Sequence, residues 1–151
     1  MAITRDLIIT VRNDISKLNE KVFIYEGDYG IDLYFTINTK FGYKKEVNSL
    51  RALSGAKAKV RIVKPNNEEL EIDNLEVVNE KVKFTITSDI TDELSEIGVH
   101  KLQFTIGDNN GVFTIPPIQF TVKEKIKGEN NVVEIEIGTV DTSKVDYCTV
   151  L

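Results

Sequence analysis

The stretch GVHKLQFTIGDNNGVFTIPPIQFTVKE, residues 98–124, decides the fold of this chain. Its first run alternates between two faces, with His100, Leu102, Phe104 and Ile106 on one of them. Alternation with a period of two, rich in aromatic and β-branched residues, is typical of a strand. The sequence DNNG at 108–111 follows, and Asn-Gly between two alternating runs is a strong hairpin signal. The stretch therefore predicts a β-hairpin that turns at 108–111.

The second run of this hairpin changes phase part-way along. Phe113 and Ile115 share one face, and the apolar face then continues at Ile118, two positions after Pro116. Proline cannot donate a hydrogen bond to a neighbouring strand, so it is found at bulges, kinks and edges. We expect a kink at residues 116–117, where the strand can pass from one sheet to another.

The rest of the chain continues with short alternating runs and frequent turn signals. Residues 13–19 are polar and predict a helical turn or a loop, and residues 38–55 predict a long connection with a helical turn near 49–53. A short helix is expected at 88–94, with Ser88 or Asp89 as its N-cap. Strands are expected at 5–12, 21–26, 31–37, 56–62, 69–72, 75–78 and 82–86, in addition to the hairpin.

About eight or nine short strands with one small helix are typical of an all-β sandwich or barrel. We predict an all-β, immunoglobulin-like antiparallel β-sandwich with one short helix. The alternating pattern fades after Lys123, and a polar, charged run follows. The predicted organisation is therefore a β-sandwich domain over residues 1–125, then a linker or the start of a following region over 126–151. Within that region, residues 132–137 (VVEIEI) alternate again and predict a further strand.

Composition excludes several classes of protein. The chain has 151 residues and a net charge of −5, which argues against general binding to nucleic acid or to anionic membranes. One cysteine permits neither an intrachain disulfide nor a cysteine-rich zinc site. No secretory signal and no apolar run of membrane-spanning length is present in the sequence. We therefore expect a protein made in the cytoplasm, with no membrane insertion and no nucleic-acid partner.

The sequence contains little that could carry chemistry. His100 is the only histidine and falls on an apolar strand face, where a core or rim histidine with satisfied hydrogen bonds is expected. Cys148 has no histidine near it in sequence and is expected to be an unreactive thiol. No phosphate loop, nucleophile elbow or zinc motif is found. We predict no catalytic residue, no metal and no cofactor, and hence that the protein is not an enzyme.

One row of basic residues allows two interpretations. Lys57, Lys59 and Arg61 share a strand face, and Glu69 and Glu71 share a face of the next predicted strand. A phosphate-binding patch is one interpretation. Cross-strand ion pairs are the favoured one, because a hairpin would set the two rows side by side.

A protein interface is the one kind of site that the residues themselves favour. Tyrosine and arginine are enriched at interfaces. Tyr25, Tyr29 and Tyr34 fall on polar faces or in turns of the first third of the chain, and Arg5 and Arg12 flank its first strand. We predict docking through these five residues. The alternative is that the tyrosines are ordinary half-exposed strand residues.

The order of these elements resembles the N-terminal domain of the phage baseplate upper protein family, found in tailed phages of low-GC Gram-positive bacteria. The resemblance spans roughly residues 8–125. It is carried by DYGIDL at 28–33, AKAKVRIVKP at 56–65, VKFTI at 82–86, the turn at 88–94, IGVHKLQF at 97–104 and PPIQFTV at 116–122.

The resemblance implies an immunoglobulin-like structural module of the virion, located in the phage tail. Such a domain docks to other tail or baseplate proteins, connects to receptor-binding parts for host adhesion, and has no catalytic residues. We expect a homo-oligomer, most simply a trimer, in the full-length protein. The alternative function is a surface or secreted immunoglobulin-like module that binds protein or carbohydrate.

Overall fold

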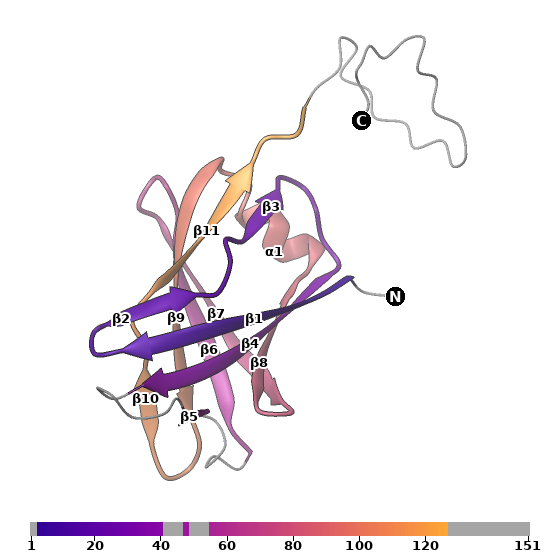
Figure 1. Ribbon diagram of the computed structural model, residues 1–151. Helices are drawn as coiled ribbons and strands as arrows, with labels where there is room; N and C mark the ends of the chain where they lie inside the picture. Colours follow the sequence, from indigo (N-terminus) through magenta and orange to yellow (C-terminus); the bar gives the residue numbers. More distant parts are fainter. Residues whose placement is uncertain (1–2, 41–46, 49–54, 127–151) are drawn as a thin grey trace.

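The computed structural model describes residues 3–40, 47–48 and 55–126, which form a curled β-sheet with one short helix (Figure 1). The helix, α1, spans Ser88–Glu93. The strands are β1 (Ile3–Arg12), β2 (Ile15–Leu18), β3 (Phe23–Tyr25), β4 (Ile31–Lys40), β5 (Val47–Asn48), β6 (Lys57–Val63), β7 (Glu69–Val78), β8 (Lys81–Ile86), β9 (Gly98–Gly107), β10 (Val112–Thr114) and β11 (Ile118–Lys123). The predicted all-β class with one short helix is confirmed.

The strands form one sheet in the order β2-β1-β4-β8-β7-β6-β9-β11-β3, with β5 added to β4 and β10 added to β9. Two of the pairings are parallel: β1 with β4 over ten residue pairs, and β11 with β3 over three. The prediction of an antiparallel sheet was therefore wrong. Alternation along a strand shows which face is buried, but it is the same for parallel and antiparallel neighbours.

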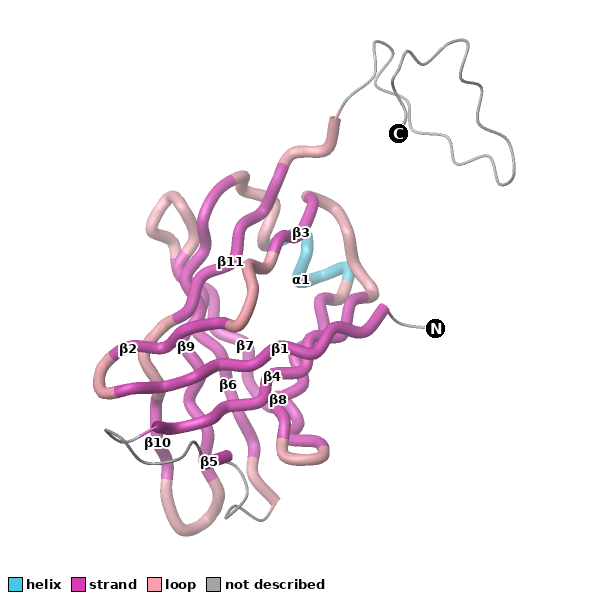
Figure 2. Tube along the Cα trace, viewed as in Figure 1, coloured by secondary structure: helices cyan, strands magenta, loops and turns pink. Residues whose placement is uncertain are grey.

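Strand β7 joins the two halves of the sheet. Its last two residues, Val77 and Val78, pair with β8, whereas its earlier residues pair with β6. The sheet curls at this strand, and its two halves face one another across the core, as the tube in Figure 2 shows. Phe35 from β4 meets Phe104 from β9 in the middle, with ring centroids 5.0 Å apart. The result is a half-barrel, and the expected immunoglobulin-like sandwich is not confirmed.

The hydrophobic core lies between these two halves. Its largest fully buried apolar side chains alternate along β1, β4, β6, β8 and β9, as the sequence pattern predicted. They are Leu7, Ile9, Phe35, Ile37, Ile62, Phe84, Ile86, Leu102, Phe104 and Ile106. Burying such side chains contributes about 1.5–3 kcal/mol each and holds the two halves together.

The hairpin predicted at 98–124 is present, with a bulge where the prolines lie. The amide of Asp108 donates to the carbonyl of Gly111 across the turn at 2.9 Å. Thr114 pairs with Thr105, and Ile118 pairs with Leu102, so three residues on one strand oppose two on the other. This extra residue reverses the inward face, which explains the change of phase. The strand does not pass to another sheet at this point, because β10 and β11 both pair with β9.

Three local predictions were wrong. Residues 15–18 form strand β2 rather than a helical turn or loop, because Asn13 adopts a positive φ of 56° and turns the chain back along β1. Residues 69–78 form one bent strand rather than two. The N-cap of α1 is Thr87, whose side-chain oxygen accepts a hydrogen bond from the amide of Ile90 at 3.2 Å, rather than Ser88 or Asp89.

Several predictions lie outside the described residues. They concern the helical turn near 49–53, most of the connection at 38–55, the strand predicted at 132–137 and Cys148. The domain boundary at residue 125 stays a prediction. The last described strand, β11, ends at Lys123.

Candidate docking surface at the open sheet edges

The order of strands in the sheet begins at β2 and ends at β3, so these two strands are edges. They are also neighbours in sequence, because residues 19–22 connect them directly. Figure 1 shows both on the same side of the half-barrel. Edge strands have backbone groups without a partner strand, which makes them sites for pairing with another chain. The chain from β2 to β3 is therefore the first place to look for an interface.

The β3 edge exposes aromatic side chains. Phe23, Tyr25 and Tyr29 have 40%, 44% and 64% of their surface exposed, and we call these three residues the aromatic edge. The ammonium group of Lys123 lies 4.0 Å from the ring centroid of Phe23, close enough for a cation–π interaction. Exposed aromatic residues on an edge strand are typical of protein interfaces.

Two hydrogen bonds and an ion pair fix the turn that carries Tyr29. The amide of Asp28 donates to the carbonyl of Tyr25 at 3.1 Å, and the amide of Gly30 donates to the carbonyl of Ile86 at 2.8 Å. The ammonium group of Lys125 lies 3.1 Å from a carboxylate oxygen of Asp28. Gly27 and Gly30 adopt positive φ angles of 83° and 78°, which glycine tolerates without strain. The aromatic edge is thus presented on an ordered turn.

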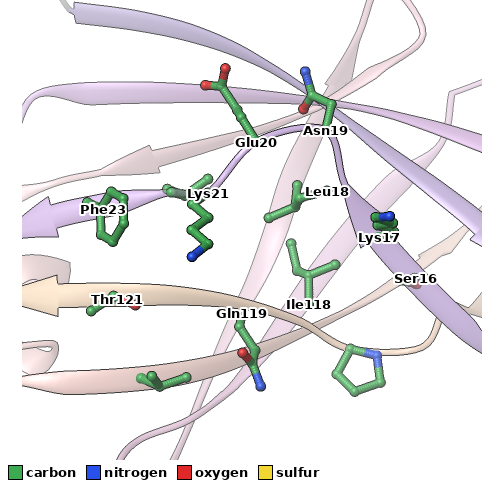
Figure 3. Close-up of a pocket in the computed structure, with 13 residues that line it drawn as sticks. Ser16, Lys17, Leu18, Asn19, Glu20, Lys21, Phe23, Ile118, Gln119 and Thr121 are labelled. Atoms are coloured by element: carbon green, nitrogen blue, oxygen red, sulfur yellow. The ribbon is translucent and has the colours of Figure 1, made fainter.

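A hollow of about 710 Å³ separates β2 from β11, and we call it the seam hollow (Figure 3). Leu18 and Ile118 point toward one another across its base, and Lys21 extends over it toward β11. Val22 is buried, whereas Lys17 and Lys21 are exposed. The hollow therefore has an apolar base with cationic side chains at its rim. It is lined by residues 16–23, Val99, Pro117, Ile118, Gln119 and Thr121.

Side-chain contacts hold the wall of the seam hollow in place. Arg5 on β1 donates a hydrogen bond to the carboxylate of Glu20. The side-chain oxygen of Asn19 accepts from the amide of Ile8 at 2.9 Å, and the amide of Asn19 donates to the carbonyl of Ile8 at 3.0 Å. The connection at 19–22 is consequently fastened to β1 on one side.

The five predicted interface residues do not form one site. Tyr25 and Tyr29 both belong to the aromatic edge, and Arg5 lies behind the seam hollow, where it holds Glu20. Arg12 is at the far end of β1, opposite Ile15. Tyr34 is half-buried on β4, with the ammonium group of Lys83 6.0 Å from its ring centroid. No contact brings Arg12 or Tyr34 to the other three residues in the described part of the chain.

Sequence reasoning missed the residues that form the seam hollow. Leu18 and Ile118 are 100 positions apart in the chain, and the curl of the sheet is what places them face to face. Lys17 lies in the stretch 13–19 that was expected to be a loop or a helical turn, and Lys21 begins the strand that was expected at 21–26. The available signal was weak, since it consisted of two lysines four residues apart beside an apolar residue.

The basic row forms the expected ion pairs. Arg61 donates to Glu71 at 3.0 Å, and its guanidinium lies 3.6 Å from the carboxylate of Glu69. The hydrogen bond from Arg61 lowers the pKa of Glu71, and the charge of Lys59 adds to this effect. A phosphate-binding patch is therefore not favoured at this row.

His100 is fully buried, and only one of its two ring nitrogens has a hydrogen-bond partner. Its Nδ1 lies 3.2 Å from the carbonyl oxygen of Gly98, whereas its Nε2 has no hydrogen-bond partner in the described structure. Its ring packs against Phe120, with centroids 5.0 Å apart. Burial lowers the pKa of His100, and the hydrogen bond to Gly98 offsets part of this shift. The expectation that both ring nitrogens of His100 would form hydrogen bonds was therefore wrong for Nε2.

Over residues 3–40, 47–48 and 55–126, no three His, Cys, Asp or Glu side chains gather as metal ligands would. The helix in these ranges has six residues, far fewer than a membrane-spanning helix requires.

No protein-family model and no curated protein matches the sequence. Among solved structures, the fold is similar to one described as the N-terminal domain of phage TP901-1 ORF48. The two share 11% sequence identity with a TM-score of 0.49, and the match covers 80% of this chain and 99% of the other. This likeness is too distant to transfer a function from one chain to the other.

Proposed function

We propose that this chain is a structural module of a phage tail, located in the virion at the baseplate or tail tip. The phage assignment is supported by the sequence resemblance over residues 8–125. The docking role is supported by the open edge strand β3, which exposes the aromatic residues Phe23, Tyr25 and Tyr29. That exposed edge is the single observation in the structure that carries the proposal.

In this role the module acts by binding neighbouring proteins when the tail is assembled. Neighbouring tail or baseplate proteins pair with the β3 edge and cover the aromatic side chains, and the region after residue 126 leads toward receptor-binding parts used in host adhesion. A symmetric assembly, most simply a homotrimer, multiplies one modest contact into a stable attachment. The module uses no metal or cofactor, does not act as an enzyme, and binds neither nucleic acid nor membrane.

The location is tested by mass spectrometry of phage particles purified from the source strain. The proposal expects peptides of this chain in a fixed ratio to the major tail protein. Their absence from intact particles would overturn the phage-tail role.

The docking surface is tested by co-purification of the chain with the structural proteins encoded beside it. Tyr25→Ala and Tyr29→Ala together are expected to reduce recovery of the partner at least tenfold, because these side chains are exposed and their loss leaves the core intact. Val112→Ala is the matched control, since Val112 is 72% exposed on β10, away from β3. Equal recovery for the tyrosine variant and the control would contradict docking at the aromatic edge.

A further inference from the structure

The seam hollow contains backbone groups that face open space from both of its walls. In an antiparallel pair, every second residue bonds to its partner strand and the residues between direct their backbone groups away from it. The amide of Asn19 donates to Ile8, so Leu18, one residue earlier, turns its backbone groups away from β1. On β11 the amide of Thr121 donates to the carbonyl that immediately precedes β3, and Gln119 faces the same side beyond the start of β3. An extended segment in the hollow therefore finds backbone donors and acceptors on β2 and on β11.

Four exposed lysine side chains lie in or beside the hollow, and we call them the seam lysines. Lys17 and Lys21 belong to its β2 wall, and Lys21 extends over it toward β11 (Figure 3). Lys101 on β9 pairs with Gln119 on β11, and residues paired in this way have side chains on the same face of the sheet. Lys123 lies on that face too, four residues further along β11. The seam lysines thus place positive charge on both sides of the hollow.

The seam lysines have no counter-charge within the described part of the chain. Most of the other described basic side chains form ion pairs, as Arg61 does with Glu71 at 3.0 Å. None of the seam lysines does so, and the carboxylate in the hollow, Glu20, is bound by Arg5. The net charge of the chain is −5, so the unmatched cations are a local feature. Charge complementarity across an interface indicates an anionic partner for such a surface.

We propose that the seam hollow binds an extended segment of a partner protein that is rich in glutamate or aspartate. An extended segment places every second side chain on one face, about 7 Å apart. Carboxylates at alternate positions then meet the seam lysines, while the backbone of the segment bonds to the open groups of β2 or β11, as in other cases of strand addition. The exposed side-chain amide of Gln119 supplies a further donor to a carboxylate.

A phosphate ligand fits these features less well than a carboxylate-rich segment does. Phosphate sites commonly use the bidentate fork of arginine or a cluster of backbone amides at a helix N-terminus. The arginine behind the hollow, Arg5, is already bound to Glu20. The seam lysines are also divided between two walls instead of converging on one point. The net charge of −5 opposes a long polyanion such as nucleic acid.

The proposal concerns the seam hollow and rests neither on the phage-tail role nor on strand pairing at β3. It is tested with the full chain and a blocked synthetic peptide of about ten residues in which glutamate alternates with threonine, a length that spans about 33 Å. Binding is measured by fluorescence anisotropy at low salt, where exposed charges are least screened. A peptide with glutamine in place of every glutamate controls for charge, and a linear polyphosphate of similar total charge controls for the kind of anion.

Lys21→Glu and Lys57→Glu form a matched pair of variants. Both lysines are exposed, both substitutions change the net charge equally, and Lys57 lies on β6, away from the hollow. Lys21→Glu is expected to weaken binding of the glutamate peptide at least about fivefold, and Lys57→Glu less than about twofold. Equal affinities of the two variants would overturn the proposal, as would equal binding of the glutamine peptide. Tighter binding of polyphosphate would overturn it in favour of a phosphate ligand.

Hydrogen exchange locates the bound peptide. The amides of Leu18 and Gln119 are expected to exchange at least about tenfold more slowly when the glutamate peptide is bound, because they then donate to its backbone. Exchange of the Phe104 amide, in the middle of β9, should stay unchanged. Unchanged exchange at Leu18 and Gln119 under saturating peptide would refute binding in the hollow. Protection of these two amides before peptide is added would also overturn the proposal and assign the occupant to the chain itself.

Discussion

The contact between Phe35 and Phe104 couples the two halves of the sheet, and truncating either ring tests this directly. Both side chains are about 1% exposed or less, and their ring centroids are 5.0 Å apart at an interplanar angle of 52°. Removing a buried phenylalanine ring costs about 3–5 kcal/mol of unfolding free energy, because the site loses its burial and a cavity remains. A tilted aromatic pair adds about 0.5–1.5 kcal/mol beyond its area.

Phe104→Ala is therefore expected to lower the free energy of unfolding by about 4 kcal/mol, a large share of the roughly 5–15 kcal/mol that stabilises a typical domain. For a domain of this size each kcal/mol corresponds to about 3–5 °C, so the melting temperature should fall by roughly 12–20 °C. Denaturant unfolding followed by far-ultraviolet circular dichroism measures the first quantity, and a thermal scan measures the second.

Milder variants keep the protein folded while they test the pairing itself. Phe35→Leu, Phe104→Leu and the double variant form a double-mutant cycle. If the rings couple the two halves, the cycle gives an interaction energy of about 1 kcal/mol. Val112→Ala, at a 72% exposed position, should change stability by less than about 0.5 kcal/mol. Additive effects of the two leucine substitutions would refute the reasoning that this ring pair joins the halves.

Three further predictions concern a glycine, a helix cap and the buried histidine. A Cβ atom at Gly107 would lie 2.8 Å from the carbonyl oxygen of Gly111, so Gly107→Ala should destabilise the protein by about 1–3 kcal/mol, whereas Gly111→Ala, with nothing within 4 Å, should be nearly neutral in the same denaturant assay. Thr87→Ala removes the N-cap of α1 and should cost about 1 kcal/mol, while Thr87→Ser should restore most of it; equal stability of the two would argue against the cap. Because burial lowers the pKa of His100, the unfolded chain binds more protons, so stability is complete above the unfolded pKa of about 6.5 and falls as the pH drops below it. His100→Leu should remove this slope between pH 7 and 5.5 in urea titrations, and a slope that persists would assign the effect to other groups.

The buried face of nearly every strand could be predicted from sequence, because alternation records which side chains avoid water and does so residue by residue. Leu102, Phe104 and Ile106 were placed correctly in the core in this way. The change of phase around Pro116 and Pro117 also predicted an irregularity, and the bulge between β10 and β11 confirms it. These are local consequences of covalent chemistry and pleat geometry.

The direction of neighbouring strands could not be predicted, since parallel and antiparallel partners impose the same alternation. Only the tertiary structure shows that β1 lies parallel to β4, and that β7 bends from one half of the sheet to the other. For the same reason the half-barrel could not be distinguished from a sandwich. Both bury the same faces of the same strands.

Of the two candidate surfaces, the aromatic edge could be predicted in part from the sequence, whereas the seam hollow could not. Tyr25 and Tyr29 could be selected by residue type and by their position beside a turn, and both prove to be exposed at an open edge. The seam hollow depends on Leu18 and Ile118, which meet only because the sheet curls until its first strand approaches its far end. The sequence by itself determined which side chains are buried on folding, because burial follows from residue type and from alternation along each strand. Only the tertiary structure decided which edges stay open and what faces them, because those depend on pairing between distant strands.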